Sequence, residues 1–190
     1  MTTKKKIMDF FKQKVLKPQM NRMFKWESMV SEYKGAIKGD ENSPVRFNIP
    51  QEAIKRDTDK MPLPGFPASF PQMIGSIINT RRSVMELEEN PLDGNKTIDD
   101  ETLAALKEFA REAGADEIGF CTVPREWVFQ DTAIAYTHAI VLVMEMDKAR
   151  METAPSPDTA TMVHETYNQL GQTSNKIAAW LREQGFAAHA

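Results

Sequence analysis

Apolar residues recur at helical spacing near the C-terminal end of the chain. Over residues 158–184, the positions on one stripe follow one another at intervals of four and three: Val163, Tyr167, Leu170, Ser174, Ile177 and Leu181. This pattern predicts a long helix with the stripe buried. Ser156 or Asp158 is the expected N-terminal cap, and Gly185 is the expected stop. Gly171, in the middle, is interpreted as a point of close packing, with a kink as the alternative.

A second helix is predicted over residues 99–113. Its first turn is acidic, Gly114 follows its last residue, and its expected buried face consists of Leu103, Leu106, Phe109, Ala110 and Ala113. Negative charge is favourable at the N-terminal end of a helix dipole. We therefore interpret Asp99, Asp100 and Glu101 as a charged helix start and not as acid–base catalysts.

Two apolar runs of strand length lie between these helices. Residues 118–123 are the first run, and residues 139–144 are continuously apolar, which predicts an internal strand covered on both faces at the centre of a sheet. Residues 185–187 predict the opening of a third strand. The connection between the first two strands is expected to include a helical turn around Trp127.

The N-terminal part of the chain has a different character. Residues 4–17 form a basic amphipathic segment that ends at Pro18. Packing of this segment on its own domain, or a frayed arm, is favoured over contact with an anionic membrane surface, which stays open as the alternative. A second helical piece is predicted over residues 19–33.

Residues 35–71 lose all periodicity and contain many prolines and glycines. They predict an irregular, extended segment wrapped over its own domain, with a proline-binding partner as the alternative. Residues 73–79 predict a short helix, and residues 86–94 an acidic turn. We therefore divide the chain into a helical and proline-rich extension (1–97) and a domain (98–190).

The charge of the chain is unevenly distributed. The chain of 190 residues has a net charge of -3 and a pI near 5.7, which argues against nucleic acid as its main partner. Up to Val30 there are eight Lys or Arg and two Asp or Glu, so this part carries about +6 and the remainder about -9. We interpret the basic part as an arm.

Cysteine content limits which cofactors the chain can hold, and hydropathy bears on the compartment expected for it. Cys121 is the single cysteine, so the chain can form neither an internal disulfide nor a cysteine cluster for zinc or iron–sulfur. No apolar run approaches the roughly 18 residues of a membrane span, and no export signal is recognised. A cytoplasmic protein is expected.

Few residues are candidates for chemistry. The three histidines, His138, His164 and His189, show no metal-ligand spacing, so no metal site is predicted. His164 is expected to be solvated, and His138 to cap the surface end of a strand, with a crevice position as the alternative. Cys121 is expected to be buried and inert, because no basic residue lies next to it in sequence. Phosphate-loop, nucleophile-elbow and Cys-x-x-Cys motifs are absent from the sequence.

Four stretches in this order resemble the reductive dehalogenase and epoxyqueuosine reductase group. They are residues 113–120 (AGADEIGF), 136–142 (YTHAIVL), 154–156 (APS) and 178–188 (AAWLREQGFAA). The resemblance covers about residues 100–190. It implies an α+β fold: an incomplete nitroreductase-like sheet with flanking helices, belonging to the N-terminal half of a corrinoid-binding domain.

The resemblance also implies cofactors that this chain does not complete. In that group a corrinoid (cobalamin) performs the reduction, and two four-iron four-sulfur clusters lie in a cysteine-rich module after the segment found here. No catalytic or cofactor-binding residue can be carried over to a position in this sequence. The resemblance therefore implies a non-catalytic, truncated or split part of an oxidoreductase, whose substrate stays open between a halogenated compound and a modified nucleoside.

Two alternatives accompany this interpretation. A standalone scaffold that keeps the fold would bind a partner, or a second copy of itself, through an unpaired sheet edge. A flavin-dependent nitroreductase relative is a weaker alternative, because the basic residues that grip the flavin phosphate are not recognisable. Either a C-terminal half or a partner chain is thus the expected partner.

Overall fold

The computed structural model combines helices with two small sheets, which confirms the α+β class. It describes residues 25–26, 28–45, 66–91, 94 and 96–190. The predictions for residues 4–17 and for most of residues 35–71 lie outside this part of the chain. Residues 25–26 and 28–32 are helical, in line with the helix predicted over residues 19–33.

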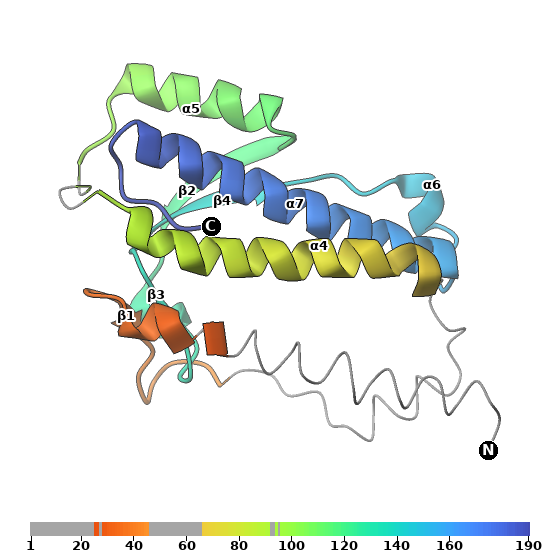
Figure 1. The fold of residues 1–190 in the computed structure, drawn as a ribbon, viewed down its shortest axis with the longest axis horizontal. Helices are drawn as coiled ribbons and strands as arrows, with labels where there is room; N and C mark the ends of the chain where they lie inside the picture. The colour runs from red at the N-terminus through yellow and green to blue at the C-terminus, as the bar shows by residue number, and fades with distance from the viewer. Residues whose placement is uncertain (1–24, 27, 46–65, 92–93, 95) are drawn as a thin grey trace.

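Three helices form one layer of the molecule. Helix α4 (Phe66–Met85) lies along the long helix α7 (Pro157–Glu183), and α5 (Asp100–Glu112) covers the other side of α7 (Figure 1). The helices α4 and α7 run parallel, because Ser69 contacts Thr161 near their starts and Glu86, just after α4, contacts Arg182 near the end of α7. A small sheet lies behind this layer.

That sheet consists of two antiparallel strands, β2 (Glu117–Thr122) and β4 (His138–Val143). The strands β1 (Ile37–Lys38) and β3 (Ala133–Ile134) pair separately, also antiparallel, beside the helical residues 28–32. Short helical segments complete the described fold: η2 (Glu86–Glu89), η3 (Arg125–Trp127) and α6 (Lys148–Met151). The turn at Trp127 confirms the prediction made for this connection.

Local signals explain the ends of α5 and α7. The Asp99 carboxylate accepts a hydrogen bond from the Thr102 amide (2.7 Å), and the Ser156 hydroxyl accepts one from the Thr159 amide (3.1 Å). Gly114 (φ +108°) and Gly185 (φ +81°) then adopt the left-handed conformation that ends each helix. The predicted bounds of both helices are confirmed, with Ser156 as the cap of α7.

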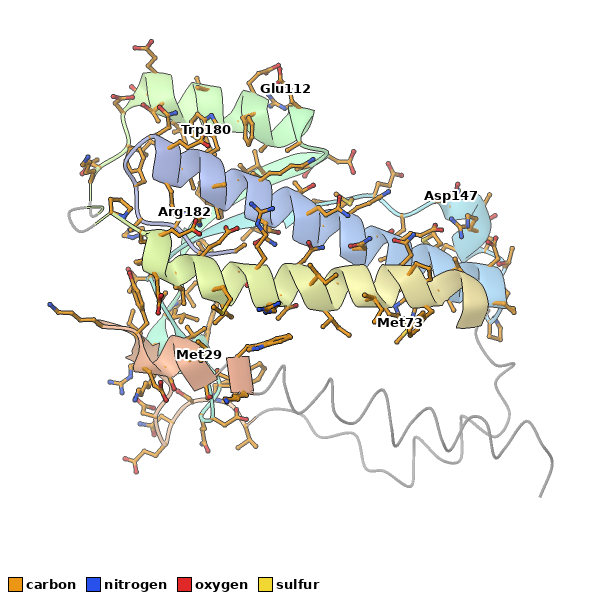
Figure 2. All side chains as sticks on the ribbon, in the orientation of Figure 1. Met29, Met73, Glu112, Asp147, Trp180 and Arg182 are labelled. Atoms are coloured by element: carbon orange, nitrogen blue, oxygen red, sulfur yellow. The ribbon has the colours of Figure 1, made fainter. Side chains whose placement is uncertain are left out.

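An apolar core lies between α5, α7 and the sheet. Its buried members are Leu106, Ala110, Ala115, Ile177, Ala178, Leu181 and Ala188. Phe109 of α5 stacks on Trp180 of α7, with ring centroids 5.6 Å apart (Figure 2). A second, smaller cluster of Val30, Val84, Leu87 and Ala135 joins the end of α4 to residues 28–32.

The interface between α4 and α7 is polar, which the predicted apolar stripe of α7 did not anticipate. Asn79 Nδ2 donates to the Asn168 carbonyl and side-chain oxygens (3.0 Å each), and Asn175 Nδ2 donates to the Asn79 carbonyl (3.1 Å). Tyr167, assigned to the buried stripe, is 56% exposed. Gly171 is confirmed as a close-packing point, because an added Cβ would lie 3.0 Å from the Asn79 side chain.

The structure corrects the bounds of one predicted element, the existence of a second and the cover of a third. The helix predicted over residues 73–79 runs from Phe66 to Met85 and includes Pro71, so residues 66–71 are helical where an extended segment was predicted. Residues 185–187 form no strand, because after Gly185 the chain turns back and the Phe186 amide bonds to the Leu181 carbonyl (2.9 Å). The strand at residues 139–144 is not covered on both faces.

Candidate functional site

The two faces of the β2–β4 sheet have different surroundings. Opposite residues in an antiparallel pair share a face, and the register pairs Ile118 with Leu142 and Gly119 with Val141. Ile118, Ile140 and Leu142 pack against the apolar core under α5 and α7. The other face carries the alternate residues, and none of the described helices lies over it (Figure 1).

We call this second face the bare face; it consists of Gly119, Cys121, Ala139, Val141 and Val143, with the exposed Glu117 opposite Val143 at one end. Val141 is 49% exposed, Val143 is 48% exposed and Cys121 is exposed. A Cβ added to Gly119 would meet no atom within 4 Å. The bare face is therefore an open, largely apolar surface. The structure contradicts two predictions: that Cys121 is buried, and that β4 is covered on both faces.

Both edges of this sheet are also open within the described residues, since β2 and β4 have only each other as neighbours. The Val123 amide donates to the Thr137 carbonyl (2.7 Å), so odd-numbered residues exchange the ladder hydrogen bonds. The amides and carbonyls of Ile118, Phe120, Ile140 and Leu142 consequently point outward at the two edges. Such rows of backbone groups are templates for another strand.

The β2 edge adds exposed apolar surface to these backbone groups. The Phe120 side chain is 45% exposed there, although its register places it on the covered face. Lys107 of α5 lies with its Nζ 5.8 Å from the centre of the Phe120 ring, close enough for a cation–π contact. A strand added at this edge would find one aromatic ring and one cation beside it.

The other candidate residues do not gather at the bare face. His138 is exposed at the start of β4, as predicted, in the register of the covered face. His164 was predicted to be solvated, but it is half-buried. Burial lowers the pKa of its imidazole. The Asp99 pKa is lowered by hydrogen bonds from Thr102, which supports its interpretation as a helix cap.

A buried charged cluster was missed by sequence reasoning. Arg182 of α7, labelled in Figure 2, is 9% exposed at its side chain. It pairs with Glu86 of η2, which also pairs with Arg82 of α4. Burial and a hydroxyl hydrogen bond to Tyr33 raise the pKa of the nearby Tyr136, while Arg182 acts in the opposite direction. No local signal in the sequence marks the pairing of Arg182 with Glu86.

The described residues do not by themselves fit the cofactors that the resemblance implies. A four-iron four-sulfur cluster needs about four thiolates, and the chain has one cysteine. No group of three His, Cys, Asp or Glu that could hold a metal ion occurs among the described residues. The bare face offers a cobalt ion no imidazole, because its only non-hydrocarbon side chains are the Cys121 thiol and the Glu117 carboxylate.

Comparisons with known proteins add no name to this geometry. No protein-family model, curated protein or solved structure matches the chain. Among the described helices, none is long and apolar enough to cross a membrane.

Proposed function

We propose that this chain is a non-catalytic module of a reductive dehalogenase-like, corrinoid and iron–sulfur dependent reductase. Its role is to supply two strands and their helical cover to a larger, nitroreductase-like sheet that a further polypeptide segment completes. The observation that carries the proposal is the β2–β4 sheet, which has one covered face, one bare apolar face and two open edges. An isolated two-stranded ribbon is marginally stable in water, so added strands would stabilise it.

The location of the resembling stretches supports this proposal. Residues 113–120 span the end of α5 and most of β2, and residues 136–142 lead into β4. Residues 154–156 precede α7 and include its cap, and residues 178–188 contain the end of α7. The stretches thus fall on the one structural unit that encloses the apolar core.

In a reductase of this class the cofactors carry the redox chemistry, and the protein positions them. The residues of this chain would only hold the sheet in place and shield it from water. Ile118, Ile140 and Leu142 anchor the sheet to its helices, and the bare face excludes water once other segments lie over it. The covering segments would have to be apolar opposite Val141 and Val143.

The first experiment measures cobalamin binding by the purified chain, as a shift in visible absorbance, with anaerobic iron analysis alongside. We expect neither iron nor stoichiometric cobalamin, because the site would need residues from other segments. Stoichiometric cobalamin without iron would instead make the chain a cofactor-binding protein. Bound iron and sulfide at cluster stoichiometry would overturn the non-catalytic assignment.

A standalone scaffold that associates with a second copy is the alternative that the same surface favours. The bare face spans about 200 Å², from six residues at about 3.4 Å and two strands at about 4.8 Å. A stable interface buries about 800 Å² per partner, so the bare face alone is too small and an edge would have to join. Light scattering at several concentrations tests this: a dimer that Val141→Asp dissociates favours the scaffold, and a monomer at all concentrations excludes self-association.

A further inference from the structure

After α7 the chain folds back as a short segment, residues 186–190, which we call the strap. The Ala187 amide donates to the Gly94 carbonyl (3.1 Å), and the Ala188 amide donates to the Asn90 side-chain oxygen (2.7 Å). Arg182 Nη1 donates to the Ala188 carbonyl (3.3 Å). The strap is therefore held on the segment that follows α4.

The strap also completes the apolar core. Ala188 is a buried member of the core, and Ala190 packs against it together with Ile140 and Leu142 of β4. An added Cβ at Gly94 would lie 2.5 Å from the Ala187 nitrogen, so the strap lies directly on this glycine. Undocking of the strap would uncover part of the inner side of β4.

His189 lies within the strap at a position where protonation of its imidazole is unfavourable. Its Nε2 is buried and has no hydrogen-bond partner among the described residues. Burial, together with the nearby Arg182 guanidinium, lowers the pKa of His189. A charged imidazole at this position would be desolvated and would face a buried cation.

Around the strap, the carboxylates of the described side chains Glu86 and Glu89 are already paired with arginine. From α7 comes Arg182, which is paired with Glu86 and lies 3.9 Å from Glu89, both from η2. From α4 comes Arg82, which also pairs with Glu86. The phenol of Tyr136, near Arg182, carries no charge, and burial raises its pKa further above its ordinary value. The Lys96 ammonium, close to Gly185, adds a further positive charge.

We propose that the strap is a pH-sensitive latch, docked while His189 is neutral and released when His189 is protonated. The undocked imidazole binds a proton near its ordinary pKa of 6.5, and the docked imidazole does so only at lower pH. Docking is therefore fully favourable above pH 6.5 and weakens as the pH falls below it. Release would loosen α7 and η2 from each other and expose Ile140 and Leu142.

Amide hydrogen exchange at Ala187 and Ala188, corrected for intrinsic rates, tests the latch between pH 7.5 and pH 5. The opening constant should rise by up to about 30-fold, since the free imidazole is about 97% protonated at pH 5. In His189→Gln the rise should disappear, while His164→Asn, the matched control, should keep it. A pH-independent opening constant in the wild type, or an unchanged rise in His189→Gln, would overturn the proposal.

One further measurement keeps the test decisive if a variant folds poorly. The imidazole pKa of His189, followed by NMR in the unmodified chain, should lie below 6.5. A value at or above 6.5 would contradict the latch.

Discussion

Helix α7 packs against apolar side chains on one side and against polar side chains on the other. Toward α5 and the sheet, Ile177, Ala178 and Leu181 join a core that contains no charged residue. Toward α4, the contacts are amide and hydroxyl hydrogen bonds, ending in the buried Glu86–Arg182 pair. One helix is thus held by two different kinds of interaction.

The difference shows what each kind of interaction requires. Apolar burial is nondirectional and tolerates small shifts, whereas a buried amide or guanidinium must meet a partner at hydrogen-bond distance or lose free energy. The polar side therefore fixes the register of α4 on α7. Asn79 demonstrates this, because its side chain reaches Asn168 while its carbonyl accepts from Asn175.

The largest effect is expected on the apolar side. Leu106 is 1% exposed, so Leu106→Ala should lower the free energy of unfolding by about 3 to 5 kcal/mol through lost burial and a cavity. Urea denaturation measures the change. Ala105→Ser, on the exposed side of α5, is the matched control and should stay within about 0.5 kcal/mol. A cost below about 1 kcal/mol for Leu106→Ala would mean that this core is loosely packed.

The next effect is expected at the charged end of the polar side. Glu86→Gln removes the carboxylate that Arg182 and Arg82 share and should cost about 3 kcal/mol, because it leaves a buried cation with only distant compensation from Glu89. Glu152→Gln breaks an exposed pair with Lys148 and should cost less than about 0.5 kcal/mol. Equal costs in urea denaturation would contradict the buried position of Arg182.

A smaller effect is expected where the polar side is tightest. Gly171→Val places methyl groups against Asn79 and should cost about 1 to 3 kcal/mol by overpacking. Gly119→Val, on the bare face, meets nothing within 4 Å and should be neutral or stabilising, since valine favours a strand. Thermal unfolding of both variants measures the contrast. A costly Gly119→Val would show that the bare face is covered in solution.

The smallest effect is expected on the bare face itself. Val141→Thr should change the free energy of unfolding by less than about 0.5 kcal/mol, because this side chain is already half in water. Leu142→Thr, its neighbour on the covered face, should cost about 2 kcal/mol. If a completing segment is added, the Val141→Thr variant should bind it more weakly than the original chain does. In the complex of the original chain, the Cys121 thiol should react more slowly with a thiol reagent than in the free chain.

Part of the candidate site was predictable. The two runs that form β2 and β4 were found from their hydrophobicity. The burial of Cys121 and of both faces of β4 was predicted wrongly, because a continuous apolar run does not reveal how many layers cover it. Val141 and Val143 have the same hydrophobicity as Ile140 and Leu142, yet only the second pair meets helices.

The polar contacts were beyond prediction for a related reason. Asn175, Thr173 and Arg182 have the composition of a solvated helix face. Nothing local indicates that Asn175 will meet α4, Thr173 the end of α5 and Arg182 the η2 segment. The strap was predicted as a strand from Phe186 and its neighbours. Its amides instead bond to Gly94 and Asn90, which lie far away in sequence.

By itself, the sequence determined the elements with local causes: the cap at Ser156, the stops at Gly114 and Gly185, the apolar face of α5, and the two strand runs. Caps, left-handed glycines and periodicity act within a few residues, so they can be recognised without the fold. Only the tertiary structure decided which face of β4 is bare, that α4 lies on α7 through polar groups, and that His189 lies within the electrostatic influence of Arg182. Those facts depend on contacts between residues distant in the chain, which no local pattern encodes.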